Sequence, residues 1–114
     1  LKGLPNLYCD TSAVAESGAF ETIIQVLGHD RLLWGSDWAV SHARGKYVSV
    51  GYSWVWIEPD TVPPPRYADQ SPFVFNGLES LRALKQAAIH TGLSDSQIED
   101  VFFGNLAGVL GVEG

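Results

Sequence analysis

The chain has 114 residues, of which 46% are hydrophobic and 18% are charged, and this composition is typical of one globular domain or of part of a larger one. The formal net charge is −6 and no cluster of Lys and Arg occurs, which argues against nucleic acid and anionic membrane surfaces as partners. No apolar run approaches the ~20 residues that span a bilayer, and Cys9 is the only cysteine, so an internal disulfide is excluded and a cytoplasmic location is expected.

The first third of the chain predicts a strand, a helix and a second strand. Residues 6–12 (NLYCDTS) alternate in the manner of a short strand. Residues 19–28 (AFETIIQVLG) carry apolar side chains at the spacing of one helical face and end on a glycine. Residues 30–37 (DRLLWGSD) supply the second strand. A strand–helix–strand unit with these short connections predicts a parallel, buried sheet.

A long connection over residues 39–76 shows no helical pattern. Within it, KYVSVGYSWVWI predicts a short strand or an extended flap, with one alternating face formed by Val48, Val50, Tyr52, Trp54 and Trp56. The proline-rich residues 58–72 cannot form a helix. Connections of this length are usually functional lids or disordered segments, and the many aromatic residues favour an ordered, packed loop.

The last third of the chain predicts helices. Residues 78–92 form a helix with one apolar face, made of Leu78, Leu81, Leu84 and Ala88. Ser94 and Gln97 have the spacing of a capping box that opens the next helix. The buried stripe expected for that helix consists of Ile98, Val101 and Phe102. Asn105 is expected to cap a short final helix.

Asp37 ends the second predicted strand, where the apolar run LLWGSD stops on an acid. In a parallel sheet covered by helices, the carboxyl ends of the strands carry the functional loops. An ionised carboxylate accepts hydrogen bonds only, so it needs donors, a cation or a proton to transfer. The alternative is that Asp37 simply turns the chain, as Asp often does.

Three separated blocks of the sequence carry a family resemblance. They are NLYCDTSA, LLWGSDWAVSH and LSDSQIEDVFFGNLAGVLGV. In this order they resemble the C-terminal part of an amidohydrolase-superfamily protein, in the branch that contains sugar lactonases, dicarboxylate lactonases and non-oxidative decarboxylases. The chain departs from that pattern at Ala39, where the family usually has Pro, and at Leu106, where it usually has Ala.

The resemblance implies an α/β fold that is the C-terminal portion of a (β/α)8 TIM-type barrel: its last two strands with the flanking and C-terminal helices. Residues 1–114 would be part of one such domain, with residues 39–76 as a long βα loop. The resemblance makes Asp37 a catalytic acid and a metal ligand, and the divalent metal expected is Zn or Mn, although some relatives work without one. The family's His-x-His pair would lie upstream of Leu1, and because the chain lacks methionine and begins at Leu1, we expect a processed chain or a fragment.

The function that the resemblance implies is metal-assisted hydrolysis of a lactone, or of a similar ester or amide bond, in a small carboxylated or sugar-derived substrate. Non-oxidative decarboxylation is the alternative within the superfamily. A non-catalytic binding module that uses the aromatic loop is the alternative if the chain is complete. The expected partner is a small molecule, and a homo-oligomer is compatible with the sequence. Residues 1–114 by themselves are expected to be inactive.

Further residues near the expected catalytic face have two readings each. Trp38 and His42 are the candidates for substrate binding, with core or lid packing as the alternative for Trp38 and an ordinary loop histidine as the alternative for His42. Trp54 and Trp56 either wall a pocket or pack in the core or the lid.

At the end of the first strand, Asp10 and Ser12 support the pocket or cap the following helix, and Tyr8 lies on the same side. Cys9 is expected to be a buried small hydrophobe. Of the other histidines, His29 is expected to be structural, at the opposite end of the barrel, and His90 to be solvated in the last turn of a helix.

Overall fold

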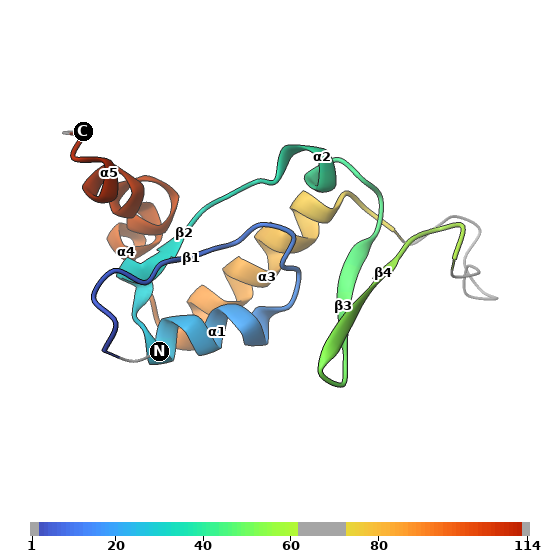
Figure 1. Cartoon of the computed structure of the whole chain (residues 1–114), viewed down its shortest axis with the longest axis horizontal. Coiled ribbons are helices and arrows are strands. Elements are labelled where there is room, and N and C mark those ends of the chain that lie inside the picture. The colour runs from blue at the N-terminus through green and yellow to red at the C-terminus, as the bar shows by residue number, and fades with distance from the viewer. Residues whose placement is uncertain (1–2, 62–72, 113–114) are drawn as a thin grey trace.

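The parallel strand–helix–strand unit is present in the fold (Figure 1). A computed structural model of the chain describes residues 3–61 and 73–112. Strand β1 (Cys9–Asp10) leads into helix α1 (Ser17–Val26), a 3-10 turn (His29–Arg31) and strand β2 (Leu32–Leu33). β1 and β2 pair in parallel, with Cys9 opposite Leu32. The order and direction of the predicted unit are therefore confirmed.

Both strands are shorter than predicted. The chain turns at the end of β1, where the Asp10 carboxylate accepts a hydrogen bond from the Ser12 amide at 2.8 Å. The regular pairing of β2 ends just as early, because the amide and the carbonyl of Gly35 bond to the Thr11 side chain and not to the β1 backbone. The amide of Trp34, which faces away from β1, donates to the carbonyl of Val101 at 2.9 Å. Each strand consequently keeps two residues of regular pairing.

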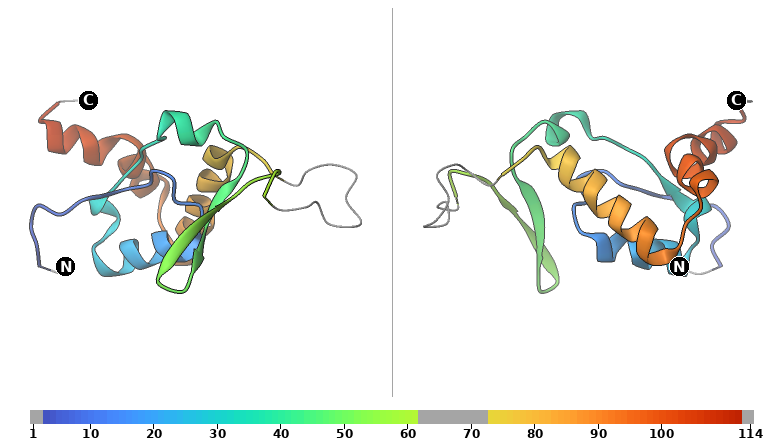
Figure 2. Two further views of the ribbon diagram at one scale, coloured as in Figure 1. Left: turned by 45° about the vertical axis from the view of Figure 1, so that its right-hand side comes forward. Right: turned by 180° about the vertical axis from the view of Figure 1, so that it is seen from behind.

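The hydrophobic core lies between the sheet, α1 and helix α3 (Asn76–Thr91), which run side by side in Figures 1 and 2. Its buried side chains come from α1, β2, α3 and the C-terminal helical segment: Phe20, Ile24, Leu32, Ala83, Leu84, Ala87 and Val101. Cys9 is half-buried and packs against this cluster, as expected for a small hydrophobe. α1, β2, α3 and the C-terminal helical segment thus share one core.

The predicted apolar face of α3 is wrong in part. Leu78 and Leu81 are 47% and 39% exposed, whereas the buried face carries Ser80, Ala83, Leu84, Ala87 and Ala88. Small side chains on this face allow the two helices to approach closely. The larger leucines therefore lie on the outer side of α3.

Residues 38–57 differ most from the expectation. A short helix, α2 (Trp38–Ser41), follows directly after Asp37, where no helix was predicted. Strands β3 (Lys46–Val50) and β4 (Ser53–Ile57) then form an antiparallel hairpin that lies beside the start of α1 in Figure 1.

The hairpin does not present the single alternating face that was predicted. Gly51 has a φ of 60° in the turn, and Ser49 pairs with Trp54 while Tyr47 pairs with Trp56. Cross-strand partners share a face, so the tryptophans lie with Tyr47 and Ser49. Val48 and its partner Val55 lie on the other face. Most of the proline-rich segment, residues 62–72, lies outside the described residues.

The C-terminal segment begins with the predicted capping box. In helix α4 (Asp95–Glu99), the Ser94 hydroxyl accepts from the Gln97 amide at 3.3 Å and the Gln97 side chain accepts from the Ser94 amide at 2.9 Å. A π-helical turn (Asp100–Gly104) and helix α5 (Asn105–Leu110) continue from it. Of the predicted stripe, Val101 is buried, whereas Ile98 is half-buried and Phe102 is 42% exposed.

Asn105 does not cap a helix, because its own backbone is helical with φ −63° and ψ −44°. Its side-chain amide instead donates to the carbonyls of His29 and Leu32, at 2.8 and 2.9 Å. It thereby fastens the C-terminal helices to the start of β2.

The α/β class is confirmed, and the described residues contain two separate two-stranded sheets. Because residues 3–61 and 73–112 form no closed barrel by themselves, membership of a (β/α)8 barrel stays a prediction. In those same residues, no helix has both the length and the apolar character needed to cross a membrane.

Candidate functional site

The carboxyl ends of β1 and β2 are held together by one buried hydroxyl group. Thr11 has no exposed surface, and its Oγ1 donates to the Gly35 carbonyl and accepts from the Gly35 amide, both at 3.0 Å. A Cβ atom on Gly35 would lie 2.8 Å from the Ser12 Oγ, so only glycine fits here without displacement. The sequence carries one signal for this pair of hydrogen bonds, because Thr11 shares one face of the predicted strand with Cys9.

Asp37 lies two residues after Gly35, in a left-handed backbone conformation with φ 48° and ψ 70°. This conformation is uncommon for residues other than glycine, and Asp is among the few that adopt it where the chain turns. Asp37 is exposed and precedes α2, yet its side chain does not cap that helix. Among the described residues its carboxylate makes no hydrogen bond or ion pair, so it remains free to accept a proton or bind a cation.

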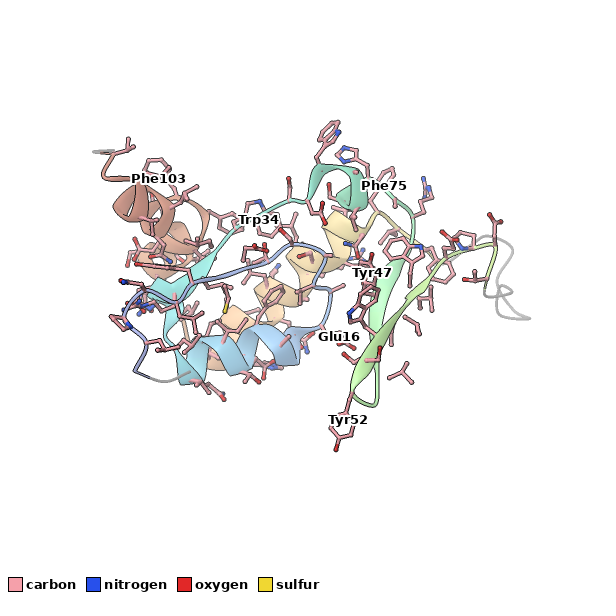
Figure 3. All side chains as sticks on the ribbon, in the orientation of Figure 1. Glu16, Trp34, Tyr47, Tyr52, Phe75 and Phe103 are labelled. Atoms are coloured by element: carbon pink, nitrogen blue, oxygen red, sulfur yellow. The ribbon has the colours of Figure 1, made fainter. Side chains whose placement is uncertain are left out.

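Trp38 and His42 lie together immediately after Asp37. Their ring centroids are 4.2 Å apart, and the His42 Nδ1 lies 3.1 Å from the Trp38 carbonyl oxygen. Trp38 is 75% exposed, so it does not serve as a core residue in this structure. The rings continue to Phe75, whose centroid lies 6.2 Å from that of His42 and beneath the guanidinium of Arg44 at 4.8 Å. Trp38, His42 and Phe75 thus form a run of neighbouring rings that begins at the residue after Asp37, and Phe75 is labelled in Figure 3.

The DTS sequence does not cap α1. The residue before that helix is Glu16, which makes no side-chain capping bond, and the Asp10 carboxylate is occupied by its local bond to the Ser12 amide. Tyr8 precedes β1 and lies under the guanidinium of Arg31 at 5.2 Å, at the amino ends of the strands. Ser12 and Asp10 both adjoin Gly35 at the carboxyl edge, where a Cβ atom on Gly35 would lie 2.8 Å from the Ser12 Oγ and 3.8 Å from the Asp10 carboxyl carbon.

A comparison with protein families places the chain in one of them. The amidohydrolase family model matches residues 1–111. The chain belongs to the amidohydrolase family. No curated protein and no solved structure matches the chain. Membership indicates an enzyme family of hydrolase type, and amidohydrolases commonly use divalent metals.

The two remaining histidines of this amidohydrolase lie away from Asp37. His29 Nε2 is 3.6 Å from an Asp100 carboxylate oxygen at the amino end of β2, which agrees with a structural role. His90 is not merely solvated, because its Nδ1 lies 3.0 Å from a Glu21 carboxylate oxygen. Each of these two histidines therefore contacts a carboxylate of another helical segment.

The described residues of this amidohydrolase do not by themselves fit a bound metal. No three His, Cys, Asp or Glu side chains within residues 3–61 and 73–112 are grouped closely enough to hold an ion. Zn²⁺ sites in proteins need three or four protein ligands, and Asp37 would supply one. These residues alone therefore support no catalytic step through a metal.

Proposed function

We propose that residues 1–114 form the last two strands and the C-terminal helices of an amidohydrolase (β/α)8 barrel. The complete enzyme would hydrolyse a lactone, or a similar ester or amide bond, in a small carboxylated or sugar-derived substrate. One observation carries this proposal: Asp37, exposed and free of partners among the described residues, follows β2 at the carboxyl edge of a parallel strand pair. This edge is where barrel enzymes hold their catalytic groups.

The barrel part of the proposal is supported by surface that lacks partners among the described residues. Large apolar side chains on the outer sides of α3 and α5 are exposed, including Leu81, Ile89, Leu106 and Leu110. An apolar cavity of about 480 Å³ also opens between α3 and α4. Large exposed apolar areas usually mark packing or interaction surfaces. Further strands and helices, supplied by polypeptide outside residues 1–114, would cover them.

Asp37 would act on the water that attacks the substrate carbonyl. Its free carboxylate can accept a proton from that water and return it to the leaving oxygen, the work of a general base followed by a general acid. The His42 Nδ1 is tied to the Trp38 carbonyl, which leaves its Nε2 as the ring nitrogen available to a substrate. Trp38 would offer an apolar face beside it.

A divalent metal, Zn²⁺ or Mn²⁺, would take Asp37 as one oxygen ligand, with its imidazole ligands supplied from outside these residues. When bound, such an ion lowers the pKa of a coordinated water and polarises a carbonyl oxygen. Both ions accept carboxylate ligands. We propose this role for Asp37 in addition to proton transfer, and it requires the rest of the site.

A panel of lactones and of small carboxylic acids tests the proposal. The protein to assay is the polypeptide that carries residues 1–114 in its native cell, called here the native polypeptide. Acid release from a lactone, lost after treatment with a chelator and restored by Zn²⁺ or Mn²⁺, is the expected result. Carbon dioxide release from an acid substrate would instead assign the decarboxylase chemistry. Binding without turnover of any compound would favour the non-catalytic module.

A further inference from the structure

A second cavity lies between the loop that follows β1 and the β3–β4 hairpin. It has a volume of about 380 Å³, within the range of about 300–1,000 Å³ found for small-molecule sites. Its floor is the loop and the start of α1, and its wall is the hairpin. The lining includes Ala13, Ala15, Ala19, Tyr47, Val48 and Trp54. In Figure 3 the hairpin residue Tyr47 lies beside Glu16 of the loop.

The wall of this cavity is fixed to its floor by polar contacts. The Glu16 carboxylate accepts hydrogen bonds from the amide of Ser49, at 3.2 Å, and from the Ser49 hydroxyl. These two bonds stabilise the charged form and hold the pKa of Glu16 below its usual value. Lys46, also on β3, lies 3.8 Å from a Glu79 carboxylate oxygen on α3. The hairpin is therefore held against the residue that precedes α1 and against α3.

The chemistry of the lining selects a flat apolar group. Tyr47 and Trp54 meet edge to face, with ring centroids 4.5 Å apart and an angle of 82° between the planes. Trp54 is still 63% exposed, so most of its surface is available to a ligand. The alanine floor leaves room opposite these rings. Aromatic rings stack or pack edge to face with such walls, and the contact adds to the benefit of burial.

The cavity adjoins the proposed catalytic edge. Ser12 lines it and also contacts Gly35, which lies two residues before Asp37. A substrate whose reacting bond lies at that edge can therefore extend toward the hairpin. Because most of its lining is apolar, the cavity suits an apolar substituent better than a charged one.

We propose that this cavity is a specificity pocket that binds a flat aromatic substituent of the substrate, with Trp54 as its main contact. The proposal rests on the proposed function only for the claim that the ligand is the substrate. The preference of the cavity for an aromatic group is a prediction about binding and does not depend on turnover.

The test compares γ-phenyl-γ-butyrolactone with unsubstituted γ-butyrolactone, two neutral probes that differ by one ring. Their dissociation constants are measured by fluorescence titration of the Asp37→Asn form of the native polypeptide, which removes turnover. We expect the phenyl lactone to bind at least tenfold more tightly. Trp54→Ala should weaken its binding about fivefold to tenfold, the effect of one lost aromatic contact. Tyr52→Ala, at the exposed hairpin tip, should leave binding unchanged.

Ala19→Leu is the second variant, because it fills the cavity from the surface of α1 and leaves Trp54 intact. It should abolish the preference for the phenyl lactone. Equal binding of the two lactones, or no effect of either pocket variant, would overturn the proposal. Failure of the proposed function gives a different result: neither lactone is turned over by the unmodified protein, while the binding preference persists.

Discussion

Thr11→Val removes the hydroxyl that joins the carboxyl ends of the two parallel strands while keeping the shape of the side chain. Thr11 is fully buried, and its Oγ1 makes two hydrogen bonds to the backbone of Gly35, both at 3.0 Å. Valine can make neither bond. The amide and the carbonyl of Gly35, which lie in a partly buried position, would then lack these partners.

The expected loss of unfolding free energy is about 2 kcal/mol. Each hydrogen bond contributes a net of about 1 kcal/mol, and the cost is larger where a group stays buried without a partner. Thr11→Ser is the matched control, because it keeps the hydroxyl and loses one methyl group, worth about 0.8 kcal/mol. The valine variant should therefore be the less stable of the two.

Urea denaturation of the native polypeptide, followed by tryptophan fluorescence, measures this difference. An unchanged slope with a lower midpoint would show that stability alone has changed. The reasoning is refuted if Thr11→Val is as stable as the unmodified protein, or if Thr11→Ser is the more damaging change. Either result would mean that the two hydrogen bonds between Thr11 and Gly35 do not stabilise the fold as argued.

Three further predictions concern the elements around the site. The pKa of Glu16 is lowered by its hydrogen bonds to Ser49. The contact between Glu16 and the hairpin should therefore be fully present above the ordinary Glu pKa and should weaken as the pH falls through the lowered value. The NMR shifts of the hairpin tryptophans should follow this titration, and Glu16→Gln should abolish it. Asn105→Ala removes two hydrogen bonds, including one to the His29 carbonyl, and should lower the free energy of unfolding by about 2 kcal/mol in urea denaturation. A loss below a few tenths of a kcal/mol would contradict the anchoring role of Asn105. Phe20→Ala should cost about 3–5 kcal/mol by thermal or urea denaturation, because Phe20 has no exposed surface; a near-neutral result would mean that α1 is not part of the core.

Local patterns in the sequence predict the elements whose signals lie within a few residues. The periodic helices α1 and α3 and the capping box of Ser94 and Gln97 are in this class, and the structure confirms them. The buried face of α3 was harder to predict, since hydrophobicity alone favours large leucines over alanines. Close packing of two helices selects the small side chains instead.

Long-range contacts explain what the sequence did not predict. Thr11 and Gly35 are 24 positions apart, and Asn105 reaches the His29 carbonyl across 76 positions, so no local pattern reveals either pair. The short helix after Asp37 has too few residues for a periodic signal. In the hairpin, the turn at Gly51 reverses the chain, and an alternation counted through it therefore assigned Val48 to the wrong face.

The sequence predicted that Asp37 follows the second strand but not what surrounds it, and the catalytic role of Asp37 stays a prediction. Asp37 follows β2 in chain order, and Trp38 and His42 adjoin it, as expected from their spacing. The stack with Phe75 and the cavity at Trp54 depend on how residues 38–57 fold back, which composition does not determine. The roles of Trp38, His42 and Trp54 toward a substrate stay predictions.

The most direct test of the central claim is the kcat/KM of Asp37→Asn in the native polypeptide on a lactone that the unmodified protein hydrolyses. Asp30→Asn is the control, because Asp30 is also exposed but lies at the amino end of β2, paired with Arg31. Loss of a general base costs about a hundredfold to ten-thousandfold. We expect a loss of this size for Asp37→Asn with unchanged stability, and activity close to normal for Asp30→Asn. Equal activity of the two variants would contradict the assignment of Asp37 as the catalytic acid of this amidohydrolase.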